Sequence, residues 1–122
     1  MILVDTSVWI DHLRISNATL ARLLGEGRVL VHSFVIGELA LGNLRQRAAL
    51  LEALRQMPQA KVAADEEVFG FIETHRLHGL GIGYVDVHLL ASARLTGSRF
   101  WTRDQRLAVV AERLDLRAEP VV

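Results

Sequence analysis

The opening segment MILVDTSVWIDHLR constrains the fold most strongly, because a short apolar run meets a carboxylate and then a helical pattern. Residues 2–5 predict a strand that is buried on both faces. Asp5 stands at the carboxyl end of this strand, where Thr6 or Ser7 can cap the following helix. A strand buried on both faces needs helices on either side of its sheet, so the segment favours an α/β fold with a mainly parallel sheet.

Strand and helix patterns alternate along the rest of the chain. After the strand at 2–5, further short strands are predicted at 29–31, 61–63, 98–102 and 116–117, with helices in between that include 34–41, 45–57, 84–96 and 105–114. Asn17 and Ser33 are the predicted N-caps of two of these helices. The whole chain, residues 1–122, is therefore expected to form one domain with a central sheet of about four to five strands and about seven flanking helices.

Composition excludes several classes of protein. The 14 basic and 14 acidic residues cancel, which argues against an overall electrostatic affinity for nucleic acid but leaves local patches open. The chain contains no cysteine, so disulfides and thiolate metal sites are excluded. No apolar run approaches the roughly 20 residues that span a bilayer, and no basic region precedes the first apolar residues. A cytoplasmic protein without a membrane contact is the expectation.

Four acidic residues occupy positions where a solvated charge is not expected. Asp5 and Asp104 each follow a predicted strand, and ligands bind at the carboxyl ends of parallel strands. Glu38 lies in the apolar helix SFVIGELALG, and Asp86 lies in the first turn of another apolar helix after a glycine loop. Each has a structural alternative. Asp5 and Asp104 can cap helices, Asp86 can interact with a helix dipole, and Glu38 can pair with an arginine in the core.

Convergence of these four carboxylates would create a strong electrostatic conflict, because like charges within a few ångströms raise one another's pKa. A divalent cation removes that conflict. Ligation by oxygen alone, without cysteine or an evident histidine pair, selects a hard ion such as Mg²⁺ or Mn²⁺. The chemistry of such a site is typically phosphoryl or phosphodiester transfer.

The order of these motifs resembles that of the PIN-domain ribonucleases, and most closely the VapC toxins of bacterial toxin–antitoxin pairs. The matching stretches are ILVDTSVWIDHLR, SFVIGELALG, GYVDVHLLASARLTG and FWTRDQRL, which together extend over nearly the whole chain. The resemblance implies that the four acids form the catalytic metal site with Mg²⁺ or Mn²⁺. It also implies hydroxyl groups beside that site, and these map to Thr6, Ser7 and Thr102.

The same resemblance implies an activity and partners. Hydrolysis of RNA by a metal-activated water would leave a 5′-phosphate and a 3′-hydroxyl. Arg103 and Arg106 are candidate contacts to the RNA, with ordinary surface arginines as the alternative. Family members typically form homodimers and higher toxin–antitoxin assemblies, are inhibited by a VapB-type antitoxin, and reach DNA only through that antitoxin.

Two other classes of function stay open. A catalytically silent PIN-like module would bind RNA or protein without cleaving it. A receiver-like signalling domain also combines a parallel sheet with an acidic Mg²⁺ pocket, but it needs paired acids at the first strand end and a lysine near the last strand. Here Asp5 stands alone and Lys61 precedes that position. Among nearby residues, Asp11 is expected on a solvated helix face, and Trp9 and Trp101 are expected to pack beside the site.

Overall fold

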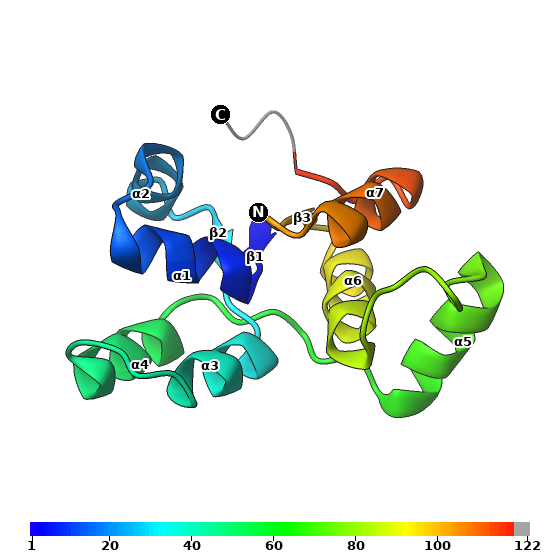
Figure 1. Ribbon diagram of the computed structural model, residues 1–122, viewed down its shortest axis with the longest axis horizontal. Helices are drawn as coiled ribbons and strands as arrows, with labels where there is room; N and C mark the ends of the chain where they lie inside the picture. Colours follow the sequence, from blue (N-terminus) through cyan, green and yellow to red (C-terminus); the bar gives the residue numbers. More distant parts are fainter. Residues whose placement is uncertain (119–122) are drawn as a thin grey trace.

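The computed structural model describes residues 1–118 (Figure 1). Strands and helices alternate along this part of the chain, which confirms the predicted α/β class. None of the described helices is both long and apolar enough to cross a membrane. The elements are β1 Ile2–Val4, α1 Thr6–Arg14, α2 Ala18–Gly25, β2 Val29–Leu30, α3 Ser33–Ala40, α4 Arg47–Gln56, α5 Asp65–His75, α6 Tyr84–Thr96, β3 Arg99–Trp101 and α7 Gln105–Arg113.

The three strands form a parallel sheet in the order β2-β1-β3, with β1 at its centre. Leu3 pairs with Leu30 on one side and with Phe100 on the other. Figure 1 shows α1, α2 and α7 on one side of the strands and α3 to α6 on the other. The central strand is therefore covered on both faces, as its apolar sequence predicted.

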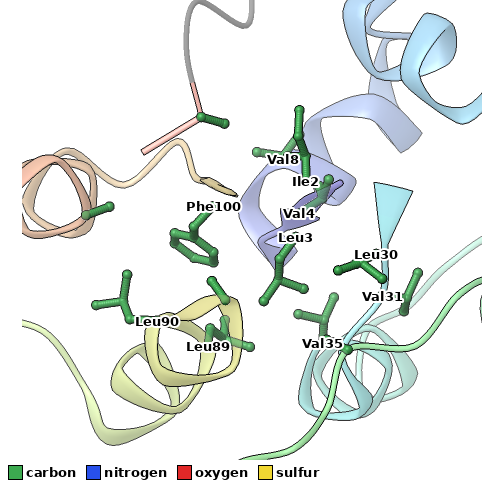
Figure 2. Packing of buried hydrophobic residues seen from close by; sticks show 14 of the residues in the cluster. Ile2, Leu3, Val4, Val8, Leu30, Val31, Val35, Leu89, Leu90 and Phe100 are labelled. Carbon is green, nitrogen blue, oxygen red and sulfur yellow. The ribbon is translucent and has the colours of Figure 1, made fainter. Parts of the chain in front are cut away.

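The packing around β1 follows the alternation of side chains along a strand. Figure 2 shows Leu3 directed toward Leu89 of α6 and Val35 of α3, while Val8 of α1 lies on the opposite side of the strand. Leu3 and Val4 are fully buried. Both faces of β1 are buried, so the residue at its carboxyl end lies where the core meets the edge of the sheet.

The described residues contain three strands, where four to five were expected. Each of the two outer segments pairs with the sheet through only one residue, so neither forms a strand. Isolated parallel bridges join Val31 to Gln59 and Phe100 to Arg117. The predicted strand at 61–63 is wrong. The pairing lies earlier, where the Val31 N–H donates to the Pro58 carbonyl at 2.9 Å and the Ala60 N–H donates to the Val31 carbonyl at 2.8 Å. After Ala60 the chain leaves the sheet to reach α5.

The helix caps agree only partly with prediction. Asn17 caps α2, because its side chain accepts a hydrogen bond from the Leu20 N–H at 2.9 Å. The prediction that Ser33 caps α3 is wrong, since the helix begins at Ser33 and its cap is His32. The Nδ1 of His32 accepts from the Phe34 N–H at 3.0 Å.

The ring of His32 also connects two helices inside the core. Its Nε2 lies 2.9 Å from the Ser92 hydroxyl of α6, and the residue is 0% exposed. Since Nδ1 accepts a hydrogen bond, the neutral ring carries its proton on Nε2 and donates it to Ser92. Burial, followed by the nearby His88, lowers the pKa of His32 from 6.5 to about 4.

This depressed pKa predicts an acid-sensitive fold. Between pH 6.5 and pH 4, the unfolded chain binds a proton at residue 32 that the folded chain does not bind. The free energy of unfolding should therefore fall as pH falls through this window, by about 3 kcal/mol from this group. Urea unfolding at a series of pH values measures the dependence.

The variant His32→Asn isolates this contribution, because the asparagine side chain can still cap α3 but cannot titrate. We expect its unfolding free energy to depend less steeply on pH between 6.5 and 4 than that of the wild type. His78→Asn replaces an exposed histidine and is the matched control. Parallel pH curves for His32→Asn and the wild type would contradict the assignment.

Candidate active site

The four predicted acids lie around the carboxyl edge of the sheet. Asp5 follows β1, and Asp104 follows the neighbouring strand β3 after two intervening residues. Asp86 is in the first turn of α6, and Glu38 is on α3. Because β1 and β3 are parallel neighbours, their ends deliver Asp5 and Asp104 to the same edge, as the sequence predicted.

Asp5 is the most buried of the four acids, with 7% of its surface exposed. Its Oδ2 accepts two hydrogen bonds, from the Ser7 hydroxyl at 2.8 Å and from the Thr102 hydroxyl at 2.7 Å. Its side chain does not cap α1, although Asp5 occupies the cap position. The hydroxyls of Ser7 and Thr102 therefore orient this carboxylate, and the alternative that Asp5 acts as a side-chain helix cap is wrong.

Asp86 and Asp104 both satisfy backbone groups at helix starts. Asp86 Oδ2 accepts from the Gly83 N–H at 2.9 Å, and Asp104 Oδ1 accepts from the Leu107 N–H at 3.0 Å. The structural alternatives, in which these two acids interact with the starts of helices, are thus correct for one oxygen of each carboxylate. They leave the other oxygen without a hydrogen bond from any described residue.

Glu38 differs from the prediction, because its side chain is exposed rather than buried in an apolar helix. The core face of α3 carries Val35, Ile36 and Leu39, and Glu38 lies on the remaining, solvated face. Its Oε1 accepts a hydrogen bond from the Thr6 hydroxyl at 2.7 Å. Thr6 therefore connects Glu38 to the segment that carries Asp5, and the alternative that Glu38 pairs with a core arginine is wrong.

The electrostatics of Asp86 show that two of the other acids act on it. Burial raises the pKa of Asp86 above its ordinary value, and the charges of Asp5 and Asp104 raise it further. The Gly83 N–H acts in the opposite direction, because it stabilises the ionised carboxylate. Asp86 is therefore close enough to Asp5 and Asp104 for their charges to oppose its ionisation.

The donor set fits a hard divalent cation. Each of the four carboxylates uses one oxygen in a hydrogen bond and keeps the other free of donors from residues 1–118. In that part of the chain, no three histidine or acidic side chains are grouped closely enough to hold an ion as they stand. Repulsion between carboxylates opposes their approach to one another, and attraction to a bound cation would outweigh that repulsion. Side-chain rotation toward a shared ion would then complete the site.

Two arginines near the acids have different surroundings. Arg103 donates its backbone N–H to the Ser7 hydroxyl at 3.0 Å, and its Nε lies 3.2 Å from Asp11 Oδ2. The sequence indicated a solvated helix face for Asp11 and missed this contact. Arg106 lies along the backbone of Gly81, where a Cβ would come within 2.6 Å of its Nη1. With φ at 77°, Gly81 permits both the turn and this close approach.

The two tryptophans pack as predicted. Trp9 is buried on α1, and Trp101 is half-buried at the end of β3 and packs against the core. The buried indole ring of Trp9 is therefore not a surface on which a base could stack.

A family model and curated relatives both place this chain in the same family. The model of the PIN domain matches residues 2–113. Ribonuclease VapC32 from two strains of Mycobacterium tuberculosis, CDC 1551 / Oshkosh and ATCC 25618 / H37Rv, is 49% identical over 108 residues. The matched region covers 88% of this chain and 87% of those proteins.

Three solved structures share the fold. FitAcB from Neisseria gonorrhoeae superimposes with a TM-score of 0.62 at 22% identity, over 92% of this chain and 94% of that one. FitAB bound to an IR36 DNA fragment gives 0.60 at 22% identity, over 92% and 91%. PAE2754 from Pyrobaculum aerophilum gives 0.59 at 18% identity, over 93% and 85%. At these identities the likeness concerns the fold alone.

The repulsion among the acids predicts the effect of removing one charge. Asparagine caps helices as well as aspartate does, so Asp104→Asn keeps the cap of α7 while removing a negative charge. We expect the pKa of Asp86 to fall toward its ordinary value, as measured by NMR titration of its carboxyl carbon. Glu112→Gln, which removes an exposed charge near the end of α7, is the control. An unchanged pKa of Asp86 in Asp104→Asn would assign the shift to burial and Asp5.

Proposed function

Since this chain belongs to the PIN-domain family, we propose that it is a VapC-type ribonuclease toxin that hydrolyses RNA phosphodiester bonds and is inhibited by an antitoxin. The observation that carries the proposal is the 49% identity with Ribonuclease VapC32 over most of both chains. The four acids around one sheet edge support it, because this arrangement is suited to metal-assisted hydrolysis.

The proposed ligands of one or more Mg²⁺ or Mn²⁺ ions are Asp5, Glu38, Asp86 and Asp104. When bound, such an ion supplies a Lewis acid that lowers the pKa of a water and offsets charge on the scissile phosphate. The chain itself orients the ligands. Ser7 and Thr102 hold Oδ2 of Asp5 and so leave its Oδ1 available to the ion.

Similar hydrogen bonds orient the carboxylates of the other three acids. The Gly83 N–H holds one oxygen of Asp86, and the Leu107 N–H holds one oxygen of Asp104. The Thr6 hydroxyl holds Oε1 of Glu38. Each of these carboxylates is therefore held through one oxygen, which leaves the other oxygen available to a shared ion.

We also propose the partners that accompany this activity: RNA as substrate, a VapB-type antitoxin, a homodimer, and a higher toxin–antitoxin assembly that reaches DNA through the antitoxin. Exposed apolar side chains support a protein interface. Ile15 after α1 is 82% exposed and Leu41 after α3 is 90% exposed. A cytoplasmic location is part of the same proposal.

A second candidate is a catalytically silent module that binds RNA or protein. The observation that favours it is that, as they lie in residues 1–118, no three acidic or histidine side chains form a ready metal site. The two candidates differ in whether a divalent ion draws the acids together and supports cleavage.

The ribonuclease proposal predicts metal-dependent cleavage by the purified, antitoxin-free protein. With Mn²⁺ or Mg²⁺ it should cut RNA, and EDTA should abolish the activity. Asp5→Asn and Asp86→Asn should each reduce the rate by at least about 100-fold, because each removes a charged ligand. Asp86→Asn retains an oxygen for the Gly83 N–H, so its folding is the easier to preserve.

The control for these variants is Glu112→Gln, whose side chain is exposed and paired with Arg117 at 3.1 Å. It should cleave at the wild-type rate. Thermal unfolding by circular dichroism checks that every variant is folded. If the wild-type protein leaves all RNAs intact with either ion, the enzyme proposal fails and the silent module is supported.

A further inference from the structure

Arg103 is attached to α1 at two points, which are one helical turn apart. Its backbone N–H donates to the Ser7 hydroxyl at 3.0 Å, and its Nε lies 3.2 Å from Asp11 Oδ2. Ser7 and Asp11 are four residues apart on α1 and so share one face of that helix. The same Ser7 hydroxyl donates to Asp5, which joins Arg103 to the most buried acid of the site.

The ion pair with Asp11 leaves most of the guanidinium group free. It engages Nε, while the two Nη amino groups form no hydrogen bond with any residue in 1–118. The side chain of Arg103 is 58% exposed, and its backbone lies between Thr102, which holds Asp5, and Asp104. Within residues 1–118, the two Nη groups of this largely exposed side chain are thus free to bind a ligand, and the backbone that carries them adjoins Asp104.

From this geometry we propose that Arg103 binds an RNA backbone phosphate next to the scissile bond, and that Asp11 is the positioning residue that orients its guanidinium group. The inference rests on the proposed ribonuclease function and names a substrate contact of the same site. The two Nη groups of an arginine match two phosphate oxygens, which makes this side chain suited to the task.

Electrostatics explain why such a residue is needed here. Asp5 and Asp104 oppose the ionisation of Asp86, and these acids would also repel a polyanionic strand. A fixed cation at the rim opposes this repulsion. Of the arginines of α7, Arg106 packs against the backbone of Gly81, and Arg113 donates to the carbonyl oxygens of His75 and Arg76.

The ion pair itself contributes little to folding, because both partners are largely solvated. Its effect is on the conformational freedom of Arg103. An arginine that is already restricted by Asp11 loses less side-chain entropy when it binds a phosphate. Removing Asp11 should therefore weaken RNA binding, even though it also removes a negative charge that repels RNA.

The test measures cleavage of a short single-stranded RNA by the full chain with Mn²⁺ at several salt concentrations. Arg103→Ala should raise KM about 10-fold and make KM less dependent on salt by about one counterion, with kcat changed less than about twofold. Arg103→Lys should fall between Arg103→Ala and the wild type, because lysine keeps the charge but lacks the paired donors.

The role of Asp11 is tested in two backgrounds. Asp11→Asn should raise KM about threefold in the wild type, where it releases Arg103. In the Arg103→Ala background, the same substitution should leave KM unchanged or lower it, since only the repulsive charge is removed. If Asp11→Asn lowers KM equally in both backgrounds, Asp11 acts only as a charge and its positioning role is wrong.

A matched control is the exposed pair of Arg28 and Glu26, whose side chains lie 3.4 Å apart. Arg28 precedes β2, at the opposite end of the sheet from the acids. Arg28→Ala changes the net charge as Arg103→Ala does and should leave KM unchanged. An equal rise of KM in both variants would overturn the proposal in favour of a general charge effect.

Failure of this inference can be told apart from failure of the ribonuclease proposal. If the wild type cleaves RNA and Arg103→Ala has the same KM and salt dependence, the phosphate site is wrong and the enzyme stands. If the wild type does not cleave, fluorescence anisotropy of the labelled RNA with Ca²⁺ decides. Weaker binding by Arg103→Ala than by Arg28→Ala supports the phosphate site, and equal binding overturns it.

Discussion

The parallel pairing of β1 with β3 is the contact from which the site is built. Val4 pairs with Trp101, and the Asp5 N–H then donates to the Trp101 carbonyl at 2.9 Å. This register places Thr102 beside Asp5, so that the hydroxyl after one strand reaches the carboxylate after the other at 2.7 Å. A shift of the register by one residue would turn these side chains to opposite faces of the sheet and separate them.

Asp86 and Asp104 at this edge each combine a structural role with a proposed role as ligands. One oxygen of Asp86 and one oxygen of Asp104 hold the first turns of α6 and α7, and the second oxygen of each is free of donors from the described residues. Structural and functional interpretations of such residues are therefore not exclusive. The raised pKa of Asp86 indicates that its ionisation is opposed in the folded chain, which is typical of sites that tolerate local destabilisation for function.

The sequence predicted those parts of the fold that depend on local pattern, and with them the placement of Asp5 and Asp104 at one edge of the sheet. The apolar run before Asp5 required a strand covered on both faces, and two acids at the ends of neighbouring parallel strands had to meet. Features that depend on tertiary contacts were not predictable in this way. Glu38 looked buried because α3 is apolar on average, but its solvated face is occupied by Gly37 and Glu38. The cap of α3 was assigned to Ser33, because a ring nitrogen held by Ser92 across the core leaves no local signal.

The contact between Asp11 and Arg103 is also a tertiary contact that the sequence did not predict. It bears on how a chain with no net charge could bind a polyanion. Net charge carries no information about such a site, because the acids and the basic rim cancel in the sum while they are separated in space. In the proposed function, a positive group beside the carboxylates would offset their repulsion of the strand. The ends of β1 and β3 provide both within a few residues, since Asp5 and Asp104 lie on either side of the position where α1 holds Arg103.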